Sequence, residues 1–213
     1  MAPVALCRDL MDMPDSFVTT LGGTVAEVTH QHPLGFMPAA LMTDLLRCIM
    51  DSECENDKDS LKSCVLDAAE TVRRLYGFMY PEDWKVLKGL VDNAVELADA
   101  DMADVDAIGQ LGEGWVGDEA LAIALYCALK HYDSFEDAVV AAVNHNGDSD
   151  STGAVCGNIL GLVYGYDALP SHFKDQVELS DVLTEVAEDL WNGCPEKDAD
   201  PEVLDGWIRK YLK

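Results

Sequence analysis

Apolar residues recur along most of this chain every three or four positions, which is the spacing of one face of an α-helix. Sustained alternation of apolar and polar residues, the pattern of a half-buried strand, is almost absent. The expected helices cover a stretch that begins at Thr24, and then residues 36–50, 61–79, 81–97, 119–132, 134–143, 154–164, 175–192 and 201–212. The pattern predicts an all-α fold of roughly eight to ten helices.

Residues typical of helix ends support several of these boundaries. Pro81 stands at an expected first helical position, where its missing N–H is not needed. Ser134 and Asp137 are spaced as in a capping box. Gly22 and Gly23 are expected to interrupt the chain, so that the helix after them begins with Thr24 as its cap.

The length and charge of the chain limit the number of domains and the kinds of partner that we expect. The 213 residues contain no Pro/Ser-rich linker or low-complexity tract, so we expect one domain over residues 1–213. The 40 acidic residues against 14 basic ones give a formal charge of −26, which argues against nucleic acid as a partner because phosphates would be repelled. Such a surface favours solubility and attracts cations, and a solvated acidic face that says nothing about partners is the favoured interpretation.

The seven cysteines include no C-x-x-C pair, and several lie in helical apolar patterns. We therefore expect a reducing compartment, with these thiols acting as small buried hydrophobic groups rather than as a disulfide or zinc framework. Residues 1–10 do not show the basic-then-apolar pattern of a secretion signal, and no run approaches the ~20 uninterrupted apolar residues of a membrane helix. A cytoplasmic protein that does not contact the membrane is the expectation.

Carboxylate, hydroxyl and amide side chains are concentrated in one polar stretch from Asn144 to Gly153, directly before an apolar helical run. Asp148 and Asp150 are two positions apart, so in an extended loop both carboxylates face the same way, and Ser151 follows them. Oxygen ligands at this density suit Mg²⁺, with Mn²⁺ or Ca²⁺ as alternatives.

Asp and Ser before an apolar run are also the residues that cap helices. The residues alone therefore leave a cation site and a helix cap both open for this stretch. A calcium-binding EF-hand loop is excluded, because its twelfth position requires Glu and Ile159 stands there.

The helix after this stretch carries glycine at every fourth position, at residues 153, 157, 161 and 165. Each interior glycine costs roughly 0.5–1 kcal/mol relative to alanine, so the row is expected to serve a purpose. Close packing of a neighbouring helix is the favoured reason, and close approach of a ligand is the alternative.

His30 and His32 flank Gln31 just before Pro33. A histidine beside a turn is commonly a packed or capping residue, and the other interpretation is a role in a site. The sequence contains no G-x-S-x-G nucleophile motif and no phosphate-binding P-loop.

The polar stretch from Asn144 to Gly153 and the segment around His30 resemble motifs of the ADP-ribosylglycohydrolase family. Gly147-Asp148-Ser149-Asp150-Ser151 is similar to the family's G-D-x-D-[ST] signature. Three further segments resemble family motifs in the expected order: Ala2-Pro3-Val4, Val28-Thr29-His30 with His32-Pro33, and Gly114-Trp115-Val116 with Asp118-Glu119-Ala120-Leu121. After the signature, Leu162-Val163-Tyr164-Gly165-Tyr166 and Leu169-Pro170 also match.

This resemblance implies an orthogonal multi-helix bundle that binds ADP-ribose or an ADP-ribosylated protein with one or two Mg²⁺ ions. By the same resemblance, the metal ligands are Asp148, Asp150 and Ser151. The substrate-binding residues that it implies are His30, Asn146, Gly147 and Gly153. The implied reaction is Mg²⁺-dependent hydrolysis that removes ADP-ribose from modified proteins or small conjugates.

The chain departs from the family pattern at its N-terminal end. Family members carry a G-D-A-x-G…E motif and a T-D-D-[ST] motif before the Ala2-Pro3 segment, and neither motif occurs in this sequence. We therefore expect an N-terminally shortened domain whose catalytic residue is unknown. The alternative is a catalytically incomplete relative that binds ADP-ribose or another protein, and an apolar face left by the absent part would favour a homodimer.

Overall fold

The computed structural model describes residues 1–51, 57–195 and 199–212, and every regular element within them is a helix. The expected all-α class is confirmed. The described residues form twelve α-helices and two 3₁₀ helices, more than the eight to ten expected, because helices as short as α1 and α10 have no apolar period to reveal them. The elements are α1 Ala2–Ala5, η1 Arg8–Leu10, α2 Asp15–Glu27, α3 Pro33–Asp51, α4 Lys58–Tyr76, α5 Pro81–Asp99, α6 Asp104–Leu111, α7 Gly117–Lys130, α8 Phe135–Val143, α9 Ser149–Tyr164, η2 Tyr166–Ala168, α10 Ser171–Asp175, α11 Ser180–Asn192 and α12 Pro201–Tyr211.

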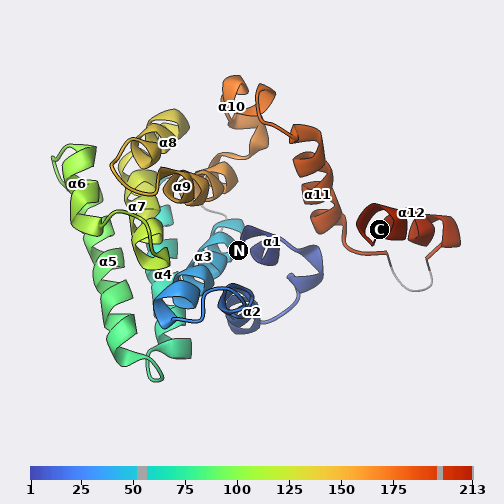
Figure 1. Cartoon of the computed structure of the whole chain (residues 1–213), viewed down its shortest axis with the longest axis horizontal. Helices are drawn as coiled ribbons and strands as arrows, with labels where there is room; N and C mark the ends of the chain where they lie inside the picture. Colours follow the sequence, from blue (N-terminus) through green and yellow to red (C-terminus); the bar gives the residue numbers. More distant parts are fainter. Residues whose placement is uncertain (52–56, 196–198, 213) are drawn as a thin grey trace.

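The helix α7 lies at the centre of the fold. Every residue from Ala120 to Leu129 is buried, and α7 packs against α3, α5, α8 and α9 (Figure 1). A helix that is apolar on all sides is stable in water only when other helices surround it. The N-terminal end of α7 is thereby held beside the start of α3 and the start of α9.

The helix α3 is the second core element, packed against α2, α4 and α7. By length and composition alone α3 could cross a membrane, but 67% of its most apolar window is buried inside the fold. That burial is what a core helix requires.

The expected break at Gly22 and Gly23 is wrong, because α2 runs through both residues and Thr24 lies inside the helix. The two glycines instead let α2 pack very closely on its neighbours. A Cβ on Gly22 would lie 2.1 Å from Thr43 Oγ1, and a Cβ on Gly23 would lie 2.7 Å from the Tyr76 hydroxyl. Close packing therefore outweighs the low helix propensity of glycine here.

Other helix boundaries agree with the sequence signals. Pro81 occupies the first turn of α5. Ser134 caps α8, because its hydroxyl accepts a hydrogen bond of 3.2 Å from the backbone N–H of Asp137.

The cysteines are more varied than expected. Cys64, Cys127 and Cys156 are buried, and burial raises the pKa of the Cys156 thiol to about 12. Cys194 is exposed, and Cys54 lies outside the described residues.

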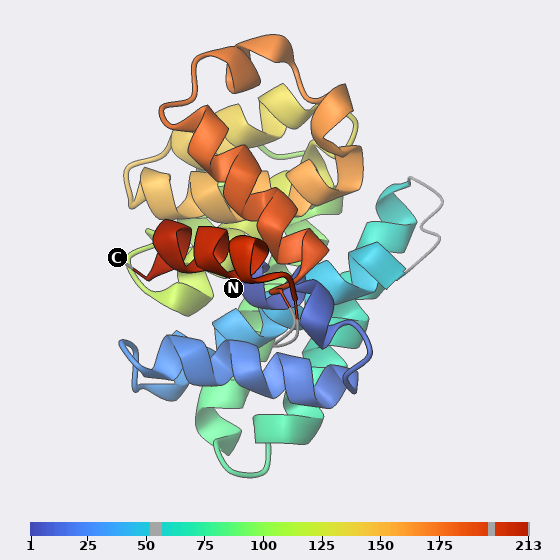
Figure 2. The same cartoon turned by 90° about the vertical axis from the view of Figure 1, so that its right-hand side faces the viewer.

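The helices α11 and α12 lie beside the main body rather than within it (Figures 1 and 2). Among the described residues, none after Leu160 is buried. The core, and with it the cavity described below, is therefore built from α1 to α9.

Candidate functional site

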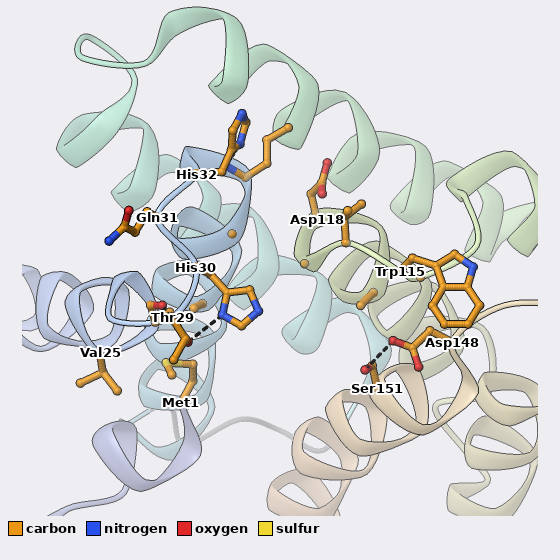
Figure 3. A pocket seen from close by; sticks show the side chains of 18 residues that line it. Met1, Val25, Thr29, His30, Gln31, His32, Trp115, Asp118, Asp148 and Ser151 are labelled. Carbon is orange, nitrogen blue, oxygen red and sulfur yellow. Dashed lines mark hydrogen bonds between the residues drawn. The ribbon is translucent and has the colours of Figure 1, made fainter.

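A cavity of about 940 Å³ opens where three parts of the chain meet (Figure 3). Its walls come from the α2–α3 connection with His30, from the segment leading into α7 with Trp115 and Asp118, and from the start of α9 with Asp148 and Ser151. Three of the four motifs that resemble the family therefore converge on one cavity. This volume is within the usual range for sites of small molecules and cofactors.

The start of α9 presents the predicted carboxylates and hydroxyl. Asp148 is the residue before the helix, and the Ser151 hydroxyl donates a hydrogen bond of 2.8 Å to Asp148 Oδ2. Asp150 Oδ1 accepts a hydrogen bond of 3.0 Å from the Ser151 backbone N–H. Asp148 has the position of a helix cap, but its side chain makes no capping hydrogen bond to the described backbone.

The neighbours of Asp148 favour its ionised form. Hydrogen bonding to Asp150, and secondly to Ser151, lowers the pKa of Asp148 below its usual value. Asp148 is therefore ionised at neutral pH, as a ligand for a cation must be.

Residues that the sequence analysis did not single out hold this loop in place. The Thr152 hydroxyl is buried and donates to the Ala142 carbonyl oxygen at 2.6 Å, while His145 Nε2 lies 3.0 Å from the same hydroxyl. The Asp148 backbone N–H donates to the Glu113 carbonyl oxygen at 2.8 Å. These bonds fix the direction in which α9 starts.

Not every predicted substrate-binding residue lines the cavity. His30 does so, and it is exposed, with Nδ1 2.8 Å from the Thr29 hydroxyl, so it is not a packed core histidine. Asn146, Gly147 and Gly153, like the predicted metal ligand Asp150, lie outside the cavity lining. Their assigned roles stay predictions.

Packing explains two of these glycines. A Cβ on Gly147 would lie 1.7 Å from the Glu113 carbonyl oxygen, so only glycine fits where the two loops cross. A Cβ on Gly153 would lie 2.6 Å from Val143 on α8. At Gly157 and Gly161 a Cβ would meet no atom of the described residues within 4 Å, so the expected close packing holds for the first glycine of the row only.

The loop before α7 is braced by two glutamates. Glu119 Oε2 accepts hydrogen bonds from the backbone N–H groups of Glu113 and Gly114 at 3.0 and 3.1 Å. Trp115 Nε1 donates to Glu113 Oε2 at 3.1 Å, and Trp115 is 66% exposed at the cavity wall. Trp115 could be noticed in the sequence as an aromatic residue between glycines. The hydrogen bonds of Glu119 to the loop have no such sequence signal.

Comparison with known proteins identifies the family. A sequence model of the ADP-ribosylglycohydrolase family matches residues 1–200. The chain is 35% identical over 71 residues to an ADP-ribosylarginine hydrolase Tri1 of Serratia proteamaculans, covering 33% of this chain and 19% of that protein. It is 22% identical over 175 residues to the human ADP-ribosylhydrolase ARH3, covering 72% of this chain and 46% of that protein.

A third relative is the ADP-ribosyl-[dinitrogen reductase] glycohydrolase of Rhodospirillum rubrum, 36% identical over 47 residues, which cover 22% of this chain and 16% of that protein. The matches thus span less than half the length of each of these relatives. Because the family model covers nearly all of the sequence, the chain belongs to the ADP-ribosylglycohydrolase family.

Proposed function

We propose that this chain binds ADP-ribose conjugates in the cavity of about 940 Å³ and takes part in hydrolysis of the bond between ADP-ribose and its acceptor. The observation that carries this proposal is the hydrogen-bonded pair of Asp148 and Ser151, which opens into the same cavity as His30. The family's name and the names of its relatives agree with the reaction class.

The proposal includes a hard cation bound at the start of α9. Mg²⁺ is the expected ion, and Mn²⁺ or Ca²⁺ are the alternatives. Mg²⁺ in proteins commonly takes one or two carboxylates and completes its shell with water and substrate oxygens. Asp148, Asp150 and Ser151 offer donors of that kind, and the carboxylates are accessible to solvent. They fit one such ion, which when bound would orient the substrate and make a water molecule more acidic.

Different residues of the cavity would then bind different parts of ADP-ribose. Asp148 is placed to accept a hydrogen bond from one ribose hydroxyl, and the Ser151 oxygen is placed to accept one from another. The exposed Trp115 indole offers a flat apolar surface on which a nucleobase can stack. His30, on the opposite wall, adds a polar contact.

A second candidate function is an ADP-ribose-binding module without hydrolysis of its own. One observation favours it: within the described ranges, no three acidic, histidine or cysteine side chains form a group that could hold a metal ion. In this case the same cavity binds the ligand, and a group outside the described residues is needed for the reaction.

Hydrolysis and binding are separated by two assays on the same preparation. The chain is incubated with mono-ADP-ribosylated arginine and serine peptides with and without Mg²⁺, and released ADP-ribose is measured. Binding of free ADP-ribose is measured by calorimetry. Release that requires Mg²⁺ supports the first proposal, binding without release supports the second, and absence of both contradicts the two together.

A further inference from the structure

Asp118 is a buried acid in the wall of the cavity, in the first turn of α7. The residue is only 4% exposed, and its Oδ1 atom is buried without a hydrogen-bond partner among the described residues. Buried polar atoms almost always have a partner, so an unpartnered one beside a cavity indicates a group that a ligand supplies.

The surroundings of Asp118 define the chemistry of that group. Desolvation raises the pKa of the carboxyl group, and Glu119 adds to the effect, whereas the backbone N–H groups and His32 oppose it. Among the described residues that line the cavity, none is a lysine or an arginine. A carboxylate only accepts hydrogen bonds, so the missing partner is a donor.

The same carboxylate disfavours a phosphate at this end of α7. A helix N-terminus attracts anions through its free N–H groups. At α7 the negative charge of an acid in the first turn already interacts with these groups and repels a second anion. The pyrophosphate of ADP-ribose carries no hydrogen-bond donor at neutral pH. Within free ADP-ribose, the donors are therefore confined to the adenine and the two riboses.

Asp118 is also separate from the group proposed to take the terminal ribose. Figure 3 shows its carboxylate directed away from the hydrogen-bonded Asp148 and Ser151, on α7 rather than α9. The hydroxyls of the terminal ribose are taken at α9 in the proposed function. The remaining donors of ADP-ribose are the exocyclic amine of adenine and the hydroxyls of the adenosine ribose.

We propose that Asp118 accepts a hydrogen bond from the adenosine part of the ligand and thereby selects the nucleotide. This inference rests on the proposed function, since it takes ADP-ribose as the ligand. Asp118 is a specificity-determining residue here and takes no part in bond cleavage.

Ligand analogues test the inference by calorimetry. Inosine diphosphate ribose lacks the exocyclic amine and presents a carbonyl oxygen there, and the 2′-deoxyadenosine analogue lacks one ribose hydroxyl. We expect the wild-type chain to bind one of the two analogues about tenfold or more weakly than ADP-ribose, because a hydrogen bond to a buried charge is lost. The analogue that binds weakly identifies the donor.

Substitutions at Asp118 supply a readout that a structural role would not change. Asp118→Ala should bind ADP-ribose and the weaker analogue equally. Asp118→Asn, whose amide can donate as well as accept, should reverse the preference if the donor is the amine, because it can donate to the carbonyl oxygen of hypoxanthine. Asp101→Asn, at an exposed acid outside the cavity lining, is the control and should keep the wild-type preference.

The possible failures are distinguishable. Equal binding of all three ligands by the wild-type chain, with Asp118→Asn unchanged from it, would overturn the inference and leave the proposed function intact. If the wild-type chain does not bind ADP-ribose at all, both fail. Melting curves of each variant show whether it is folded, and Asp118→Asn should melt no lower than the wild type because it removes an unpartnered buried charge.

Discussion

At the scale of single residues, the described part of the chain has two buried acids in different surroundings. Asp44, on α3, accepts a hydrogen bond from the Thr19 hydroxyl of α2 and lies near Arg47. Asp118 has an oxygen with no partner among the described residues. Desolvation raises the pKa of both carboxyl groups, but of the two only Asp118 lines the cavity. The first acid joins two helices, and the second is available to a ligand.

The raised pKa of Asp44 predicts how stability depends on pH. The folded chain holds this proton more tightly than the unfolded chain, whose pKa is near 3.8. The stability that this group contributes is therefore present at low pH and is lost as the pH rises from the unfolded pKa through the folded one. Asp44→Asn keeps an acceptor for Thr19 and removes the titration.

Chemical denaturation between about pH 4 and about pH 7 measures this difference. The free energy of unfolding of the wild type should fall relative to that of Asp44→Asn as the pH rises. Parallel pH profiles of the two proteins would show that Asp44 titrates normally.

At the scale of elements, glycine has opposite roles in α2 and α9. Gly22 packs against Thr43 of α3, and a Cβ there would overlap the threonine side chain. Gly157 in α9 faces open space. The first glycine fixes the distance between two helices, whereas the second has no packing partner in the described part of the chain.

Alanine substitutions should therefore have opposite effects at these two positions. Gly22→Ala is expected to lower the free energy of unfolding by about 1–3 kcal/mol through overpacking. Gly157→Ala is expected to raise it by roughly 0.5–1 kcal/mol through helix propensity alone. Urea denaturation of both variants decides the matter, and a loss of stability in Gly157→Ala would reveal a packing role that α9 does not display.

The helices differ in how well the sequence predicts them. Apolar periodicity alone predicted α3, α4, α5 and α7, because apolar residues at helical spacing form the face that is buried. It was insufficient for α2, where the close contact between Gly22 and Thr43 depends on residues far apart in the chain. In the candidate site, the hydrogen-bonded pair of Asp148 and Ser151 could be singled out from the sequence because the two residues lie close together in it.

Asp118 shows the opposite case. It stood in the sequence only as part of a motif, because its burial comes from tertiary packing at the start of α7, where the neighbouring Gly117 lies close to residues 34 and 35 of α3. The bracing roles of Glu119 and Thr152 were missed as well, because Glu119 bonds to the loop before α7 and Thr152 bonds to the neighbouring helix α8.

At the scale of the whole molecule, the core and the cavity end where α10 begins. No described residue of α11 or α12 is buried, and neither helix lines the cavity. The C-terminal helices should therefore be dispensable for the fold and for binding.

Truncation tests this division of the chain. A chain ending at residue 178 should melt within about 4 °C of the full chain, a difference on the order of 1 kcal/mol. It should also bind ADP-ribose with the same Kd. A much lower Tm or loss of cooperative unfolding would show that α11 and α12 belong to the folding unit.

The proposed hard cation at the start of α9 can be tested by the Mg²⁺ dependence of the melting temperature. At a hundredfold excess over its Kd, a bound ion stabilises the folded state by about 2.7 kcal/mol, which raises Tm by roughly 5 °C or more. We expect this increase in the wild type and in the control Asp12→Asn with Asp101→Asn, two exposed acids outside the cavity lining. Asp148→Asn with Asp150→Asn, which changes the net charge equally, should abolish it; the same Mg²⁺-dependent increase in that variant would contradict the assignment.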